Sequence, residues 1–454
     1  MIHASWTTST VSDLLPSATS RRRLLAAVLA VLVCLGARAV CAAEKASGYQ
    51  AALESIRAAD LFESVRDLAD KALEGREAGS PGGHAAGDYL AARLAKLPLT
   101  PAGTQGYFQP FQEGFRNILA TLPGSDPQRK TYYVLVGAHY DHLGHGLRRK
   151  PGDPPGPIYP GADDNASGSS GVLALARALT LLPEPPRRSI LLVWWDAEEK
   201  GLLGSKHWTG HTTLPLDHLS AVVNLDMIGV LRQDRLEVFG ARTAYGLRRM
   251  LCEQNRESPL VLDFCWTMRA DADHFPFFQH GIPVVFFNTG LHERYHQPTD
   301  DAAHVDAEGM MRVARYAFAV VCELANQPAA PRFRAAAGRE TEDDRRRLAA
   351  PEPSPVRPGD PPLRLGIAWR LDEAEPGTIV VSHVVAGSPA AAAGLRVGDR
   401  VLRIAGRDFA DDRAFAKLAA TLPGPLDLLV ERDGRFQVLV LRFPAEAATM
   451  KRAA

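Results

Sequence analysis

The chain has 454 residues, which is long for one hydrophobic core, so we expect two folded units with appended segments. Its 52 Lys and Arg residues balance 52 Asp and Glu residues. This net charge of zero argues against a nucleic-acid partner, because no excess of cations is available to displace counterions from phosphates.

The first 43 residues have the layout of a secretory signal peptide. Arg21–Arg23 precede an apolar run, Leu24–Leu35, and small residues follow as far as Ala43. The run is short for a membrane span. We therefore predict cleavage near Ala42 or Ala43, no stable membrane span in the mature chain, and an exported protein, periplasmic or extracellular. An uncleaved anchor is the alternative, and the paired arginines leave the export pathway open between the general and twin-arginine routes.

Cysteine usage points away from a zinc–thiolate site. Cys34 and Cys41 would leave with the signal peptide, and the mature chain would keep Cys252, Cys265 and Cys322. This is an odd number without a CxxC pair, so we expect at most one disulfide after export.

Short apolar runs alternate with helical patterns between residues 44 and 326, which we predict to be the first domain. Residues 49–97 are helical, interrupted by the Gly/Pro-rich turn EGREAGSPGGH. The runs typical of strands covered on both faces are 133–138, 190–195, 221–225 and 283–287. The helices between and after them are 167–182, 201–208, 243–256 and 307–325. This alternation predicts a three-layer α/β/α sandwich with a mostly parallel or mixed central sheet.

The remainder of the chain separates into two parts. Residues 327–362 are rich in Pro, Ala, Arg and acidic residues and lack apolar periodicity, so we predict a linker. Residues 363–445 regain strand-like alternation, which predicts a second, small β domain.

Residues of metal-ligand type stand where predicted strands end or in the loops that follow. They are His139, Asp164, Glu199, Asp226 and His296. Loops that leave the carboxyl ends of strands in an open α/β sheet converge on one crevice, so these side chains can meet there. Two imidazoles and three carboxylates suit a pair of divalent cations, with zinc first. The pattern therefore predicts a hydrolytic site with two Zn²⁺ ions.

The residues around His139 and Asp164 have predicted roles of their own. Asp141 lies two residues after His139, so its carboxylate can accept a hydrogen bond from the ring nitrogen that is not on the metal. Asp164 lies in the turn GADDNASG and is placed to give one oxygen to each metal. An ordinary helix N-cap turn is the alternative, and Asp163 is the nearest rival as ligand.

Glu198 and Glu199 are adjacent at the end of the VWWDA strand. Because neighbouring side chains diverge, we predict that Glu199 binds metal while Glu198 faces the substrate as general base. Two solvated acids at a helix start are the alternative. Asp226 would complete the first metal's ligand shell, and His296 the second.

The strings around these residues are VLVGAHYDHLG, GADDNASG, VWWDAEEKGLLGS, VVNLDMIG and RYHQPTDD. In type and order they resemble those of the dinuclear zinc peptidases, a family that includes bacterial leucyl aminopeptidases, glutamate carboxypeptidase and, more distantly, glutaminyl cyclase. The resemblance covers about residues 73–325 and implies the zinc exopeptidase fold and the ligand assignment above. It also implies that Tyr295 helps to stabilise the tetrahedral oxyanion and that Met227 lines the substrate-binding pocket. Many members have a cis peptide after the bridging Asp, here Asp164–Asn165.

The string GSPAAAAGLRVGDRVLRIAGR resembles the bacterial form of a PDZ domain. In that resemblance, Leu365, Gly366 and Ile367 match the carboxylate-binding loop, whose backbone N–H groups would hold a protein C-terminus beside an open strand edge. A structural or regulatory PDZ domain without a peptide ligand is the alternative.

The function predicted from the whole sequence is an exported metal-dependent aminopeptidase that acts on peptide substrates. Carboxypeptidase or dipeptidase specificity at the same site, a transferase like glutaminyl cyclase, and a non-enzymatic binding protein that works through its PDZ domain are the alternatives. Aromatic residues between Trp266 and Phe287 are interspersed with Arg269, Asp271 and Asp273, so side-chain preference stays open.

Overall fold

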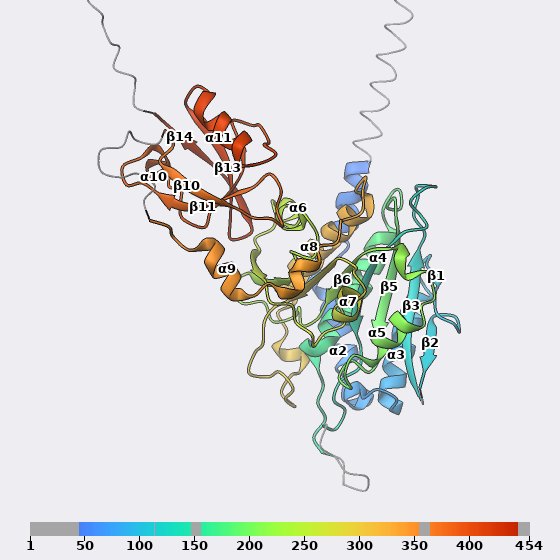
Figure 1. The fold of residues 1–454 in the computed structure, drawn as a ribbon. Helices are drawn as coiled ribbons and strands as arrows, with labels where there is room; N and C mark the ends of the chain where they lie inside the picture. The colour runs from blue at the N-terminus through green and yellow to red at the C-terminus, as the bar shows by residue number, and fades with distance from the viewer. Residues whose placement is uncertain (1–44, 113, 147–155, 354–363, 444–454) are drawn as a thin grey trace, which may run out of the picture. The chain divides into compact units, whose positions relative to one another are not determined.

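The computed structural model describes residues 45–112, 114–146, 156–353 and 364–443 (Figure 1). The predicted signal peptide lies outside these described residues. Within them, no helix is both long enough and apolar enough to cross a membrane. The described residues from 52 onward form one unit, which contains two separate sheets.

The larger sheet has nine strands in the order β1-β3-β5-β4-β6-β9-β7-β8, with β2 paired to β3. The strands are β1 (Thr100–Pro101), β2 (Phe108–Phe111), β3 (Phe115–Leu122), β4 (Tyr133–His139), β5 (Ser189–Trp195), β6 (Leu219–Leu225), β7 (Arg235–Phe239), β8 (Val261–Cys265) and β9 (Val284–Asn288). The central strands β5, β4, β6 and β9 are parallel, whereas β3 and β7 run antiparallel to their central neighbours. The mixed sheet confirms the prediction, and its central strands are buried because their apolar runs are covered on both faces.

Helices cover both faces of this sheet (Figure 1). They are α2 (Ala58–Leu68), α3 (Pro81–Leu94), α4 (Gly168–Thr180), α5 (Leu203–Gly210), α6 (Leu247–Gln254), α7 (Phe275–Gln279) and α8 (Ala307–Asn326). Helices α2, α4 and α8 pack against one another. Elsewhere, Trp208 of α5 and Phe277 of α7 pack in one core cluster with Leu135 and Leu191 of the sheet. The three-layer α/β/α sandwich is therefore confirmed.

The range predicted as a linker, 327–362, contains a 3-10 turn, Ala335–Arg339, and the helix α9 (Glu342–Ala349). Thr341 caps α9 in a reciprocal capping box with Asp344. The helix has no buried residue, so it lacks the apolar stripe by which helices are recognised in sequence. The cap and ion pairs between residues three apart support the helix locally. Arg345 also forms an ion pair with Asp263 of β8 at 2.7 Å, which ties the helix to the larger sheet.

The smaller sheet is entirely antiparallel, and its five strands follow chain order. Its elements are β10 (Ile367–Leu371), β11 (Ile379–Val384), α10 (Pro389–Ala392), β12 (Arg400–Ile404), α11 (Asp412–Thr421), β13 (Leu426–Arg432) and β14 (Arg435–Leu441). Phe415 of α11 is buried with Ile379 and Val401 in the core of this domain. Strand β10 forms one edge of the sheet, beside the face that α11 covers.

The three cysteines expected in the mature chain, Cys252, Cys265 and Cys322, are free thiols. The single disulfide that the sequence allowed is therefore not formed within the described residues. Burial raises the pKa of the Cys252 thiol well above its usual range, which is typical of an unreactive structural cysteine.

Candidate metal centre

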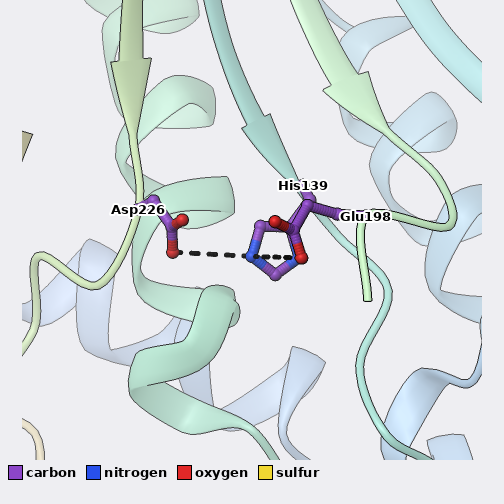
Figure 2. Close-up of side chains that lie close together, drawn as sticks. All are labelled: His139, Glu198 and Asp226. Atoms are coloured by element: carbon purple, nitrogen blue, oxygen red, sulfur yellow. Dashed lines mark ion pairs between the residues drawn. The ribbon is translucent and has the colours of Figure 1, made fainter. Parts of the chain in front are cut away.

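The residues predicted as ligands come together at the carboxyl ends of the central strands. His139 is the last residue of β4, and Asp226 directly follows β6. Asp164 lies in a π-helical turn, Ala162–Ser167, that leads into α4. Figure 2 shows His139, Glu198 and Asp226 pointing toward one another from separate strand ends. The parallel order of β5, β4 and β6 thus produces the convergence expected at one sheet edge.

One group of donor atoms surrounds His139. Its Nε2 atom lies 3.5 Å from Oδ1 of Asp226 and 3.3 Å from Oδ1 of Asp164. Ligands of a tetrahedral zinc ion, each about 2.0–2.2 Å from the metal, are separated by roughly 3.3–3.6 Å. Both separations from Nε2 of His139 are therefore those expected between two ligands of one zinc ion.

A second group surrounds His296. Its Nε2 atom lies 3.1 Å from Oδ2 of Asp164 and 3.3 Å from Oε2 of Glu199. These separations are again close to those of a tetrahedral zinc shell. Asp164 directs Oδ1 to one group and Oδ2 to the other, which is the geometry of a bridging carboxylate.

Glu198 lies beside the first group, with Oε2 4.0 Å from Nε2 of His139. Burial raises the pKa of the Glu198 carboxyl well above its usual range, against an opposing effect of His139, and the charges of Asp273 and Asp226 add to the increase. A carboxyl group with a raised pKa holds a proton more strongly than an ordinary glutamate does, which suits a group that takes up a proton and later returns it.

Asp141 has a different partner from the one predicted. The Nδ1 atom of His139 lies 3.2 Å from the backbone oxygen of Asp141, within hydrogen-bond geometry, but 3.7 Å from its carboxylate. The carboxylate instead accepts the backbone N–H groups of Glu198, at 3.0 Å, and Glu199, at 3.3 Å. These N–H groups belong to a mostly buried turn and need an acceptor, so Asp141 fixes the turn that carries both glutamates.

His142 belongs to the site and was not predicted. It is 1% exposed, and its Nδ1 atom lies 2.8 Å from Oε1 of Glu199 and 3.8 Å from Oδ2 of Asp164. Together, the three residues offer donor atoms close enough for one metal ion. The signal was present in VLVGAHYDHLG, where a second histidine follows His139 by three residues.

Asp163, the alternative to Asp164 as ligand, is held by other groups. Its Oδ2 atom lies 3.0 Å from Nε2 of His292, and its Oδ1 atom accepts the backbone N–H of Gly229. The backbone N–H groups of Asp163 and Asp164 both donate to the carboxylate of Asp300, at 3.0 and 3.1 Å. This network turns Asp163 away from the two donor groups and leaves Asp164 facing them.

Tyr295 and Met227 lie next to predicted ligands. The Tyr295 ring stacks on the ring of His296 with 3.8 Å between centroids. Burial, followed by the charges of nearby carboxylates, raises the pKa of Tyr295, so its hydroxyl keeps its proton. Met227 is 3% exposed, and its N–H donates to Oδ1 of Asn165. The Asp164–Asn165 peptide bond is cis, as expected.

In the smaller domain, Leu365, Gly366 and Ile367 line a groove of about 390 Å³. The opposite wall is made of the α11 alanines Ala416 and Ala419, with Ala420 beside them. Gly366 has φ +77°, and a Cβ atom there would approach the Ser388 side chain to 2.1 Å. The groove runs beside β10, the edge strand.

Histidines and carboxylates that converge in two groups at the strand ends of an α/β sheet are typical of metallohydrolases. Residues 117–321 match peptidase family M28, and residues 380–432 match a PDZ domain. The chain therefore carries a peptidase domain of family M28 and a C-terminal PDZ domain.

Several known proteins are similar to the peptidase domain. Aminopeptidase YwaD of Bacillus subtilis (strain 168) is 30% identical over 209 residues, which cover 44% of this chain and 42% of that protein. A probable leucine aminopeptidase of Arthroderma otae (strain ATCC MYA-4605 / CBS 113480) is 28% identical over 246 residues, covering 50% of this chain and 62% of that protein. The match thus spans about half the length of these relatives.

A solved structure has the same fold. The Legionella pneumophila LapA aminopeptidase is 22% identical, with a TM-score of 0.50, over 62% of this chain and 75% of that chain. At this level of identity the likeness concerns the arrangement of helices and strands.

Proposed function

We propose that this chain is an exported aminopeptidase that releases N-terminal residues from peptides with the help of two zinc ions. In this proposal His139 and Asp226 bind one ion, Glu199 and His296 bind the other, and Asp164 bridges them. The observation that carries it is the division of the Asp164 carboxylate between two histidines, with Oδ1 3.3 Å from His139 and Oδ2 3.1 Å from His296. Relatives named as aminopeptidases and as zinc metalloproteases support the reaction and the metal.

The side chains divide the chemical work. When bound, two divalent cations supply the Lewis acidity that hydrolysis of an amide requires. Glu198 takes the proton of the attacking water on its carboxylate and returns it to the nitrogen of the leaving amine. The protonated hydroxyl of Tyr295 donates a hydrogen bond to the oxyanion that develops on the scissile carbonyl.

The PDZ groove has a separate role in this proposal. An extended C-terminus would add a strand to the edge of β10, with its carboxylate at the backbone of Leu365–Ile367. The apolar wall of α11 would receive the last side chain. Proteins or peptides with a free C-terminus are therefore the proposed partners of this domain.

The test is hydrolysis of a panel of aminoacyl-nitroanilides and N-blocked peptides by the zinc-loaded mature chain. Release from free N-termini is expected, and Glu198→Gln should lower kcat by about 10²–10⁴-fold while metal content stays at two. Glu293→Gln is the matched control, because Glu293 is exposed in the loop that carries Tyr295.

Each other outcome selects a different function. Two bound metals without release from any free N-terminus contradict an aminopeptidase, and cleavage of N-blocked substrates at their C-termini then indicates a carboxypeptidase. A stoichiometry near one metal, with cyclisation of N-terminal glutamine, indicates a transferase. Binding of C-terminal peptides without any turnover leaves only the PDZ function.

A further inference from the structure

Arg76 is fully buried, and backbone carbonyls accept hydrogen bonds from its guanidinium. Nε donates to the carbonyl of Tyr140 at 2.9 Å, and Nη2 donates to that of Gly161 at 2.8 Å. Nη1 donates to the carbonyls of Leu68 at 2.7 Å and Pro160 at 2.6 Å. Four carbonyls, from three separate parts of the chain, thus converge on one planar guanidinium.

The positions of these carbonyls relate Arg76 to the predicted ligands. Tyr140 directly follows His139, and Gly161 lies three residues before Asp164. Leu68 is the last residue of helix α2. Arg76 therefore connects the segment that carries one ligand to the segment that carries the bridging ligand, and ties both to the end of a helix.

The backbone around Arg76 is shaped to make this connection. Glu74, Gly75 and Arg76 all have positive φ, between 49° and 70°. A Cβ atom on Gly75 would lie 2.5 Å from the carbonyl oxygen of Tyr159, so only glycine allows the close approach. The carbonyls of Gly75 and Arg76 accept the N–H groups of Gly144 and His142, at 3.0 and 3.1 Å.

The charge of Arg76 and its hydrogen bonds affect metal binding in opposite directions. Burial lowers the pKa of Arg76 to about 10, against the effect of Asp300 and Asp164, so the guanidinium is cationic at neutral pH. A buried positive charge near the ligands repels a divalent cation. The charge alone would therefore weaken metal binding.

We propose that Arg76 is a positioning residue of the metal centre, which holds the His139 and Asp164 segments at the separation that zinc requires. The inference rests on the proposed metal site. An arginine is needed because its fork offers five N–H donors in fixed directions, whereas lysine offers a single compact cation. Outer groups that orient ligands typically change metal affinity by about 10–100-fold.

The experiment measures the Zn²⁺ affinity of the full mature chain by competition with a chromophoric chelator. Arg76→Met removes both the charge and the fork. If Arg76 positions the ligands, Arg76→Met should lose about 10–100-fold in Zn²⁺ affinity. If Arg76 only balanced the charge of the carboxylates, Arg76→Met should instead bind Zn²⁺ more tightly. Unchanged or increased affinity in Arg76→Met overturns the proposal.

Two further variants separate this effect from a general loss of stability. Arg188→Met is the matched control, because Arg188 is buried and donates to the carbonyls of Leu324 and Gln327 at the end of α8. It should lower the melting temperature without changing Zn²⁺ affinity; an equal loss of affinity in Arg188→Met contradicts a specific role for Arg76. Arg76→Lys keeps the charge and should still lose affinity.

If circular dichroism shows that Arg76→Met is unfolded, Arg76→Lys decides the question. A folded Arg76→Lys with reduced affinity supports the proposal, and one with wild-type affinity overturns it. Wild-type zinc stoichiometry and peptide hydrolysis are measured in parallel. Failure of the proposed peptidase function would appear there, in the unmodified chain, and not in the comparison of variants.

Discussion

Nδ1 of His142 lies 2.8 Å from Oε1 of Glu199, while Nε2 of His296 lies 3.3 Å from the other oxygen, Oε2. The shorter distance is that of a charge-assisted hydrogen bond. The longer distance is typical of two ligands of one tetrahedral zinc ion. We therefore infer that His142 donates to Glu199 from outside the metal shell and fixes which oxygen of Glu199 faces the cation.

The first prediction concerns this histidine. His142→Leu removes the hydrogen bond and should lower the affinity for one of the two zinc ions by about 10–100-fold. His142→Asn can place an amide N–H near the position of Nδ1 and should keep most of the affinity. Zinc titration of both variants is the measurement; an equal loss in both would instead make His142 a direct ligand.

The second prediction concerns Gly161, at the start of the turn that carries Asp164. It has φ +58°, and a Cβ atom there would lie 2.2 Å from the carbonyl oxygen of Asp164 and 2.5 Å from the His142 ring. Gly161→Ala should therefore lower both zinc affinity and the free energy of unfolding, the latter by about 1–3 kcal/mol. Gly246→Ala is the control, because Gly246 also has positive φ but has open space around it. It should cost stability from backbone strain alone and leave zinc affinity unchanged.

The third prediction concerns pH. His274 is fully buried and stacked on Phe286 at 4.6 Å. Burial, followed by the charge of Arg269, lowers the pKa of His274 to about 3. The folded-state pKa of His274 is below the unfolded value of about 6.5. The contribution of the neutral His274 to the free energy of unfolding is therefore fully present above pH 6.5 and is lost as the pH falls toward 3.

The measurement is guanidinium unfolding at pH 7 and pH 5. His274→Phe should lose about 2 kcal/mol less than the wild type between these pH values, since one such histidine contributes about 1.4 kcal/mol per pH unit. The exposed His280 supplies the control, and His280→Phe should keep the wild-type pH dependence. Parallel pH curves for wild type and His274→Phe would refute the assignment.

The fourth prediction concerns the PDZ groove. Ala416 lines the groove on α11, whereas its exposed neighbour Lys417 is not among the lining residues. Ala416→Trp should fill the cavity and abolish binding of C-terminal peptides, with hydrolysis of aminoacyl-nitroanilides unchanged. Lys417→Trp should leave both intact. Fluorescence anisotropy with labelled peptides that have free or amidated C-termini is the measurement, and equal binding of the two forms would exclude carboxylate recognition.

The central strands and the residues at their ends could be predicted because their signals are local. The continuous apolar runs of β4, β5 and β6 are typical of buried parallel strands, and the polar residues that end them stand out. Strands β3, β7 and β8 were not predicted. Strands β7 and β8 are short, and charged residues such as Glu237 and Asp263 interrupt their apolar residues. The polar helix α9 was missed for want of an apolar stripe.

The parts of the site that could not be predicted depend on contacts across the chain. The sequence around Arg76 indicates only a turn, because nothing local shows that carbonyls from residues 68, 140, 160 and 161 will surround its side chain. The hydrogen bond predicted between the Asp141 carboxylate and His139 is not formed, because Nδ1 of His139 lies 3.7 Å from that carboxylate. Proximity in sequence favoured His139, whereas the fold brings the N–H groups of Glu198 and Glu199 to its carboxylate.

The carboxylate of Asp141 is the common anchor of Glu198 and Glu199, one oxygen for each N–H group. A change in the β5 turn that relocates one glutamate therefore relocates the other as well. If Glu198 transfers the proton and Glu199 binds the cation, as proposed, a substitution in this turn that alters one role will also alter the other. Adjustments of substrate preference are more safely made in loops that do not depend on Asp141.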